Sequence, residues 1–347
     1  MAPNIQNTIF LLGATGYLGS QFLILLSRRP ARFHVVALVR NPSPWKEAKL
    51  KSIYQDLTIV EGNLDDSDLI EEEAARAKYV INCASPDHYE CIEAILDGLG
   101  QQSEDRPGDP PLYIHLSGLG MASDNARGEL IDEDNIPRYT DIGFSLDQVP
   151  PDNPHVHCDM LVAEAGVRKE NPVRTIMAYP GWVYGLGEGM SKTTSALRAF
   201  LGASRTLKYA GTWGPGHNSM RNIHVKDCAN AILMILEAAV AGRADEGAEG
   251  HYFLVSNAPY VTFGEISTVI GDIMFGKGIY TRGGSQPLPP SVANAYGESG
   301  WRVLGGNNRV DPQRLKRLGW EATETNRVPL LKSLPLELEV ALHEMGY

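Results

Sequence analysis

The segment "NTIFLLGATGYLGSQFLILLSRR", residues 7–29, decides the fold class of this chain. It begins with a short apolar run rich in branched residues, which is typical of a buried strand. From Tyr17 onward the apolar residues recur with helical spacing. Gly13 and Gly16 lie between these two patterns, and Gly19 lies within the helical one. The segment therefore predicts a strand, a tight glycine-rich turn and a helix.

The same alternation continues through the first half of the chain. Further apolar strand patterns are "FHVVALV" (33–39), "LTIVEG" (57–62), "KYVINCA" (78–84) and "PLYIHLS" (111–117). Helical patterns such as "DLIEEEAARA" and "YECIEAILDGL" separate them. Continuous apolar strands that alternate with helices indicate a parallel sheet covered on both faces. We expect an α/β, Rossmann-like doubly wound fold with a smaller C-terminal substrate-binding region.

The predicted domains interleave. We expect a nucleotide-binding domain over residues 1–184, to which 218–242 return, and a smaller domain from 185–217 and 243–347. The stretch "GQQSEDRPGDPP", residues 100–111, is polar and rich in Pro and Gly, which predicts a solvated loop. Residues 121–154 have little periodicity and many acidic side chains, and they follow the fifth strand. Such a long irregular segment is expected to be functional or mobile.

Composition restricts the partners of the chain. Its 347 residues carry a formal net charge of −11, which argues against nucleic acid, because phosphate binding needs a clustered basic surface. The longest apolar stretch, residues 228–242, contains Glu237 and is too short to span a bilayer. No signal peptide is evident, and the four cysteines show no paired spacing. We expect a cytoplasmic monomer or homodimer that acts on a small molecule away from membranes.

The glycine spacing GxxGxxG is a relative of the dinucleotide-binding fingerprint. Its glycines permit a tight turn, close approach of a pyrophosphate, and close packing of helix against strand. The helix N-terminus adds free N–H groups and a partial positive charge. The second strand ends "ALVRN", with Arg40 where a site selective for NAD would carry Asp or Glu. Arginine suits the 2′-phosphate of NADP, although a solvated surface role is the alternative.

Together these motifs resemble the extended short-chain dehydrogenase/reductases, especially an atypical branch common in fungi. The resemblance covers nearly the whole chain. It rests on "EGNLDD" (61–66), "VINCAS" (80–85), "YPGWVYG" (179–185), "NIHVKDCANAI" (222–232) and "RLKRLGWEA" (314–322). It implies an adenine contact at the first motif, a ribose contact at the second, and main-chain contacts to the nicotinamide carboxamide at the third. Asp227 in the fourth is expected to cap its helix.

The glycine loop and the resemblance together assign NADP to a set of residues. They are Gly13, Thr15, Gly16, Tyr17, Leu18, Gly19, Arg40, Asn63, Leu64, Ala84, Tyr179, Pro180 and Val183.

The family's catalytic YxxxK pair is missing from "HVHCDMLVAEAG", residues 155–166. In the family the tyrosine transfers a proton and the lysine holds the ribose and lowers the tyrosine pKa. Alignment on the following Ala-Glu places Val156 and Met160 in the two positions. A shift of one residue places His155 and Asp159 there. Ser117, at the end of the fifth strand, resembles the family's serine that hydrogen-bonds the substrate oxygen, or is a strand-end serine bonded to the backbone.

Histidine suits proton transfer near neutral pH, so His155 and His157 are the expected replacements for the tyrosine. Asp159, four residues after His155, would orient its ring. The alternative is that these residues form a solvent-facing first helical turn. No metal is expected, because no second Cys/His pair follows.

Three functions remain open. The first is an NADP-dependent reductase or dehydrogenase for a small, fairly apolar carbonyl or alcohol in secondary metabolism, with a non-standard proton donor. The second is a non-redox isomerase, dehydratase or cyclase that retains NADP. The third is a cofactor-sensing binding protein like the NmrA-type regulators, which also lack the Tyr-Lys pair. Trp213, Tyr296 and Trp301 predict an apolar pocket.

Overall fold

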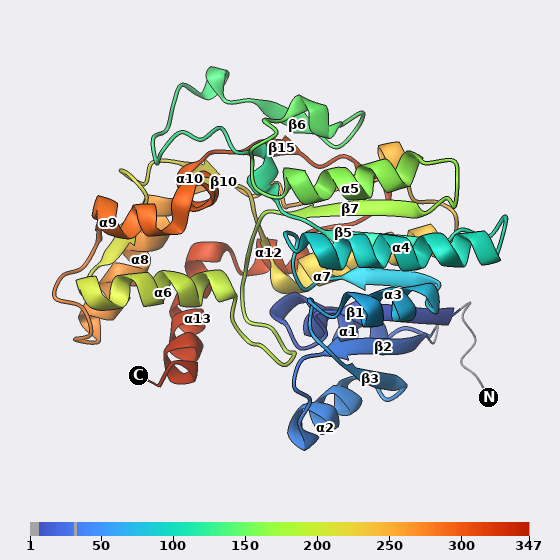
Figure 1. The fold of residues 1–347 in the computed structure, drawn as a ribbon. Coiled ribbons are helices and arrows are strands. Elements are labelled where there is room, and N and C mark those ends of the chain that lie inside the picture. Colours follow the sequence, from blue (N-terminus) through green and yellow to red (C-terminus); the bar gives the residue numbers. More distant parts are fainter. Residues whose placement is uncertain (1–6, 31–32, 347) are drawn as a thin grey trace.

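The computed structural model describes residues 7–30 and 33–346 and shows two lobes (Figure 1). The larger lobe is built on a seven-stranded parallel sheet in the order β12-β7-β5-β4-β1-β2-β3. The strands are β1 (Thr8–Leu12), β2 (His34–Val39), β3 (Leu57–Glu61), β4 (Tyr79–Asn82), β5 (Leu112–Leu116), β7 (Arg174–Pro180) and β12 (His251–Leu254). The predicted doubly wound α/β fold is confirmed, and the first five strands fall where the sequence placed them.

Helices cover both faces of this sheet. On one face lie α3 (Ser67–Ala75), α4 (Tyr89–Asp105) and α5 (Val156–Val167), and on the other lie α1 (Tyr17–Ser27) and α7 (Val225–Val240). Helix α2 (Pro44–Ile53) links β2 to β3 at the sheet edge. Alternate strand residues point to two separate apolar cores, one under each helical layer. The sheet is therefore buried on both faces, as its apolar strands predicted.

The smaller lobe has a third apolar core. Its helices are α6 (Ser195–Leu207), α8 (Phe263–Gly276), α9 (Pro290–Ala293), α10 (Gly297–Gly305) and α13 (Leu330–Glu344). Short strand pairs complete it: β9 (Ala210–Thr212) with β14 (Ser285–Pro287), and β10 (Ser219–Met220) with β13 (Val261–Thr262). Two further pairs and two short helices connect the lobes: β8 (Trp182–Tyr184) with β11 (Asn222–His224), β6 (Arg138–Thr140) with β15 (Arg309–Asp311), α11 (Arg314–Arg317) and α12 (Thr323–Arg327).

Two predicted boundaries are wrong. Residues 251–254 were expected in the smaller domain, but β12 pairs with β7 in the main sheet. Residues 100–111 were expected to be a solvated loop, but α4 continues to Asp105. Gln102 is buried there, and its amide donates to the carbonyls of Ala75 and Ala77 at 2.9 and 2.8 Å. These bonds satisfy the buried amide nitrogen and extend the helix through a polar sequence.

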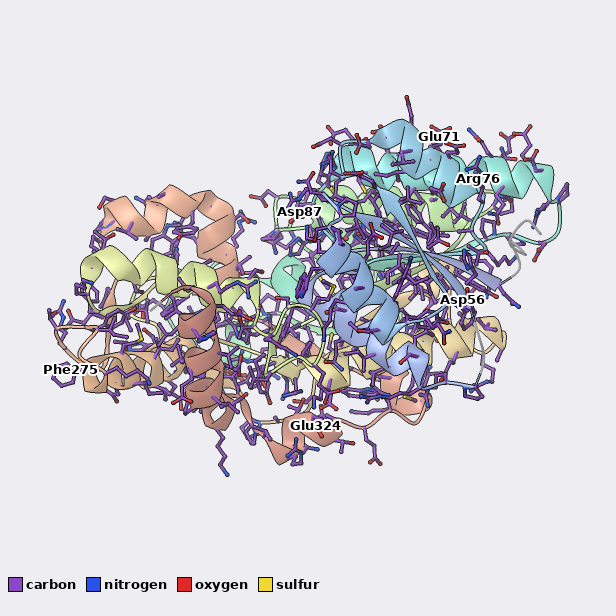
Figure 2. All side chains as sticks on the ribbon, turned by 90° about the horizontal axis from the view of Figure 1, so that it is seen from below. Asp56, Glu71, Arg76, Asp87, Phe275 and Glu324 are labelled. Carbon is purple, nitrogen blue, oxygen red and sulfur yellow. The ribbon has the colours of Figure 1, made fainter. Side chains whose placement is uncertain are left out.

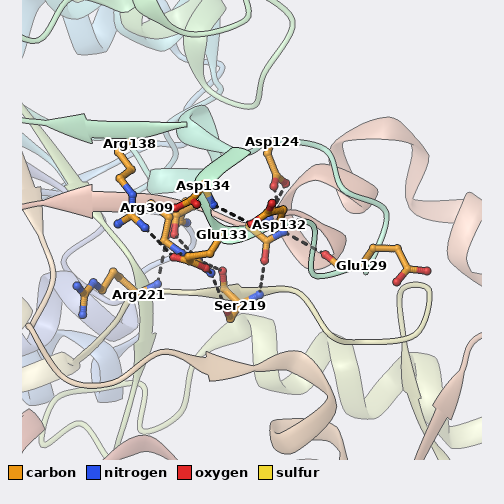
Figure 3. Close-up of polar contacts among 11 residues, drawn as sticks. Asp124, Glu129, Asp132, Glu133, Asp134, Arg138, Ser219, Arg221 and Arg309 are labelled. Carbon is orange, nitrogen blue, oxygen red and sulfur yellow. Dashed lines mark hydrogen bonds and ion pairs between the residues drawn. The ribbon is translucent and has the colours of Figure 1, made fainter. Parts of the chain in front are cut away.

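The acidic segment 121–154 is held in place by polar contacts and by β6 (Figure 3). Glu133 accepts two hydrogen bonds from the guanidinium of Arg309, at 2.6 and 2.8 Å. Asp124 accepts from the backbone and side-chain amides of Asn307 at 2.8 and 3.0 Å. A bidentate pair with a buried arginine is among the stronger polar contacts. The acidic residues therefore bind the segment to the chain around β15.

The sequence predicted that Asp227 caps its own helix, and this prediction is wrong. His224 is the N-cap of α7, and its Nδ1 accepts from the Lys226 amide. The Asp227 carboxylate instead accepts from the amides of Glu324 and Thr325, at 3.0 and 2.6 Å, and from the Thr325 hydroxyl at 2.7 Å. It therefore satisfies the first N–H groups of α12. Among the described helices, none combines the length and the apolar character needed to cross a bilayer.

Candidate active site

The three glycines between β1 and α1 have different neighbours. Gly13 has φ +85°, and a Cβ on it would lie 2.6 Å from the carbonyl carbon of Cys83. A Cβ on Gly19 would lie 2.2 Å from the Gly13 carbonyl oxygen. Both are therefore required by contact between backbones. A Cβ on Gly16 meets only the Gly13 oxygen, at 3.1 Å, so the chain itself leaves the other side of Gly16 open.

This turn fits a dinucleotide phosphate. Gly16 is the N-cap of α1, and no side chain caps the helix there. A helix N-terminus of this kind offers N–H groups and positive potential to an anion. The amide of Ala84, an exposed residue just beyond β4, lies beside Gly13, where a Cβ would come within 2.8 Å of it. Gly13, Gly16, Gly19 and Ala84 thus meet at the carboxyl edge of the sheet, as predicted.

Two cations lie near the end of β2. Arg40 is exposed at the strand end. The Lys46 ammonium donates to the carbonyls of Arg40 and Asn41, at 3.0 and 2.8 Å. This is the edge at which the family's ribose contact is expected, and the positive charge favours an additional phosphate.

Asn63, predicted as an adenine contact, is engaged within its own turn. Its amide donates to Asp66 at 2.9 Å, and its oxygen accepts from the Asp65 backbone at 2.8 Å. Among the remaining predicted cofactor residues, Tyr179 is fully buried. The others are half-buried: Thr15, Tyr17, Leu18, Leu64, Pro180 and Val183.

Three described tyrosines near this site, Tyr17, Tyr113 and Tyr179, are unsuited to replace the missing one. The Tyr17 hydroxyl donates to the Gly185 carbonyl. Tyr113 and Tyr179 are fully buried and hydrogen-bond to His115 and His251. Burial raises the pKa of Tyr17, Tyr113 and Tyr179 well above the ordinary value, so none is suited to proton transfer near neutral pH.

Ser117 and Asp159 are brought together. The Ser117 hydroxyl donates to Oδ2 of Asp159 over 2.7 Å, and the contact is buried. Asp159 is 0% exposed, and its Oδ1 lies 3.4 Å from Nε2 of His115, which is also fully buried. The geometry between these two atoms does not meet that of a hydrogen bond, so this pair is an electrostatic contact. Asp159 therefore does not contact His155, which corrects the predicted pairing.

His155 has a different partner. Its Nδ1 lies 2.8 Å from Oδ1 of Asp87, which follows β4 and faces the smaller lobe (Figure 2). The opposite nitrogen, Nε2, lies over the backbone next to Ser117, 2.9 Å from where a Cβ on Gly118 would be. His155 is the N-cap of α5 with φ +74°. A non-glycine residue held in the left-handed region at a sheet edge is strained, which is common at functional sites.

The other side chains of this turn diverge. His157 is exposed and stacks on Tyr89 of α4, with ring centroids 5.1 Å apart. Val156 and Cys158 lie in the apolar core under α5. His157, predicted as catalytic, therefore faces away from Ser117. The alignment that puts His155 and Asp159 in the two family positions is the one whose side chains reach the end of β5.

Sequence reasoning missed His115, Tyr113 and Asp87. A signal for the first two was present, because residues 113, 115 and 117 alternate along a predicted strand and must share one face. Three polar residues on a buried face of an apolar strand predict a hydrogen-bonded network. Asp87 gave no such signal, since its contact with His155 spans 68 residues of sequence.

The fold is shared with solved structures of an epimerase and a protein that binds NADPH, and this confirms the fold that the predicted resemblance implied. A UDP-glucose 4-epimerase structure from Thermotoga maritima has a TM-score of 0.62 and 15% identity, covering 98% of this chain and 100% of that one. Gre2 from Candida albicans, in complex with NADPH, has a TM-score of 0.59 and 15% identity, covering 96% and 99%. At 15% identity these neighbours show the fold, and the cofactor of this chain stays a prediction.

Two sequence comparisons add to this. The model of the NmrA-like family matches residues 5–98. A protein named oxidase ucsJ, from Acremonium sp, is 28% identical over 351 residues, covering 97% of this chain and 98% of that protein. The family match ends before Ser117 and α5, so it concerns β1 to β4, the three helices between them and the first part of α4.

Proposed function

We propose that this protein is an NADP(H)-dependent oxidoreductase acting on a small, fairly apolar carbonyl or alcohol. The observation that carries the proposal is the His155–Asp87 pair, held in a strained conformation beside Ser117 at the carboxyl edge of the sheet. Similar arrangements of a carboxylate and an imidazole position one ring nitrogen for proton transfer. The relative named an oxidase, which covers nearly the same length, supports redox chemistry.

NADP(H), when bound, supplies or accepts the hydride. The residues of the chain then have three tasks. Gly16 and the N-terminus of α1 hold phosphate. Ser117 positions the substrate oxygen. His155 exchanges a proton with that oxygen through Nε2, while Asp87 accepts from Nδ1–H and stabilises the charged ring.

The preference for NADP over NAD rests on charge. Arg40 and Lys46 lie at the end of β2, and no Asp or Glu occupies positions 40–46. An arginine can donate two parallel hydrogen bonds to a phosphate. The 2′-phosphate would therefore be stabilised at this edge.

The substrate side lies where the lobes meet. Helix α10 packs next to the turn that carries His155, with the Val303 side chain 3.4 Å from where a Cβ on Gly120 would be. Tyr296 and Trp301 belong to the same part of the smaller lobe and are at least partly exposed. Trp213 is only 2% exposed and packs in the lobe's core, so only the other two aromatic side chains are available to contact a substrate.

Two matched histidine variants test the proposal. His155→Ala should lower turnover by the roughly 10²–10⁴-fold typical of general acid-base catalysis. His157→Ala removes the same side chain type two residues away, where it stacks on Tyr89, and should leave turnover within about twofold of wild type. Turnover would be followed as NADPH consumption with a panel of ketones and as NADP⁺ reduction with the corresponding alcohols.

A cofactor-sensing protein is the alternative favoured by the NmrA-like match over residues 5–98. It would bind NADP(H) without turning over any member of the panel, and His155→Ala would leave binding unchanged. Equal loss of turnover in the two histidine variants would contradict the role assigned to His155.

A further inference from the structure

The loop 185–194, which joins β8 to α6, contacts the first turns of α1. Its Met190 amide donates to the hydroxyl oxygen of Ser20 at 2.9 Å. That hydroxyl donates in turn to the carbonyl of Gly16 at 2.6 Å. The loop that leads into the smaller lobe therefore holds the turn at which we expect the pyrophosphate to bind.

Gly185, the first residue of this loop, is hydrogen-bonded through both of its backbone groups. Its carbonyl accepts from the hydroxyl of Tyr17, which is the first residue of α1. Its amide donates to the carboxyl group of Glu337 in α13, and the hydroxyl of Ser333, one helical turn earlier, donates to the same group. Gly185 therefore connects a side chain of the smaller lobe to the phosphate turn.

Glu337 is a buried carboxyl group. It is 1% exposed, and its Oε1 has no hydrogen-bond partner among the described residues. Burial raises the pKa of Glu337 and outweighs the hydrogen bonds from Ser333 and Gly185, which lower it. The charge of this group is therefore costly, and its protonation should respond to any further charge placed nearby.

The described groups around Glu337 do not balance its charge. The buried side chains by which α8 packs on α13 are uncharged. Arg198 of α6 faces Tyr17 and lies 3.6 Å from Glu344, at the other end of α13. Four neighbouring titratable groups are neutral near pH 7, because burial raises the pKa of a tyrosine or a thiol and lowers that of an imidazole. They are Tyr17 of α1, Tyr184 of β8, Cys228 of α7 and His224, the N-cap of α7.

We propose that Glu337 is a positioning residue for the phosphate turn and that it takes up a proton from solvent when NADP(H) binds. The inference rests on the proposed function. The cofactor phosphates bring negative charge to the N-terminus of α1, which further disfavours a carboxylate that has no cation beside it. The proton adds to Oε1 and forms a neutral carboxylic acid, while the other oxygen still accepts from Gly185.

Calorimetric titration with NADPH in two buffers of different ionisation enthalpy measures the protons taken up per cofactor. A unit charge roughly 10 Å from a carboxyl group changes its proton affinity about tenfold at an effective dielectric constant near 20. From about pH 5.5 to about pH 8, the Kd of wild type for NADPH should therefore rise about tenfold more than that of Glu337→Gln. Wild type should also take up more protons. Titration of His155 and of the 2′-phosphate is common to both proteins and cancels in the comparison.

A third variant separates positioning from charge. Glu337→Gln and Glu337→Leu are both uncharged, but only glutamine offers an acceptor to the Gly185 amide. Glutamine should bind NADPH within about threefold of wild type at the acidic end of the range, and leucine about tenfold more weakly than glutamine. Glu339→Gln is the control, because Glu339 is exposed on the same helix and lies 3.7 Å from Lys277, and it should change neither quantity.

Infrared difference spectra of wild type keep the test decisive if the variants do not fold. Over the same pH range, addition of NADPH should produce the carbonyl band of a neutral carboxylic acid. Absence of this band, equal proton uptake by wild type and Glu337→Gln, or equal NADPH affinity of Glu337→Gln and Glu337→Leu would overturn the inference. These results would leave NADPH binding intact, whereas a wild type that does not bind NADPH at all would contradict the proposed function and, with it, this inference.

Discussion

Gly16→Val separates cofactor binding from folding. Gly16 has φ −75° and ψ 173°, an extended conformation that valine adopts readily. Its new Cβ would have one close neighbour, the Gly13 oxygen at 3.1 Å, which must move by a few tenths of an ångström. Valine is a poorer N-cap than glycine, so we expect the free energy of unfolding to fall by only about 1 kcal/mol.

The effect on the cofactor should be much larger. The branched side chain occupies the side of Gly16 that the chain leaves open, where a pyrophosphate would approach the N-terminus of α1. Each hydrogen bond to a charged group contributes roughly 1.5–3 kcal/mol. Loss of two would weaken NADPH binding roughly 10²–10⁴-fold.

Calorimetric titration with NADPH, together with urea unfolding, would measure both quantities. Gly276→Val is the matched control, because Gly276 ends α8 with no heavy atom within 4 Å of the position that a Cβ would take, and it should keep wild-type affinity. Gly19→Ala should instead prevent folding, since its Cβ would lie 2.2 Å from a carbonyl oxygen. Retained NADPH affinity in folded Gly16→Val would refute the phosphate role of the turn.

Three further predictions concern charge and burial. Arg40→Asp should weaken NADPH binding by about 1.5–3 kcal/mol and leave NADH binding unchanged or stronger, as measured by calorimetry. Burial lowers the pKa of His251 from 6.5 to about 4. As the pH falls, this histidine is therefore protonated in the unfolded chain before it is protonated in the folded one. The free energy of unfolding should fall by about 3 kcal/mol between pH 6.5 and pH 4. Urea unfolding of His251→Gln should lack that part of the pH dependence. Asp227→Ala leaves the donors of Thr325 and Glu324 without their buried acceptor and should cost roughly 1.5–3 kcal/mol in the same assay.

The strands and the glycine turn were predictable because they depend on local pattern. Each of the first five strands is a continuous apolar run, and a parallel sheet buried on both faces requires such runs. The end of α4 was not predictable in the same way. The polar residues after Gly100 favour a loop, and tertiary bonds from Gln101 to α3 and from Gln102 to the end of α3 keep them helical.

The sequence predicted which residues lie at the site, but it did not predict which of them contact one another. Ser117, His155 and Asp159 were identified from their positions relative to the family motif. Their partners depend on side-chain directions at the start of α5, where the left-handed conformation of His155 turns its ring toward Asp87. A regular helical geometry would have paired His155 with Asp159 instead. The strained residue is thus the reason that the simplest prediction was wrong.

Deuteride transfer tests the proposed oxidoreductase activity most directly. Small molecules that co-purify with the protein would be tested together with the panel of alcohols and ketones. Ketones would be incubated with deuterium-labelled NADPH, and deuterium-labelled alcohols with NADP⁺. The products would be analysed by mass spectrometry. Wild type and His157→Ala should move one deuterium between the nicotinamide and a substrate carbon, and His155→Ala should do so roughly 10²–10⁴-fold more slowly. Tight NADPH binding with no deuterium transferred to or from any compound would contradict the proposal.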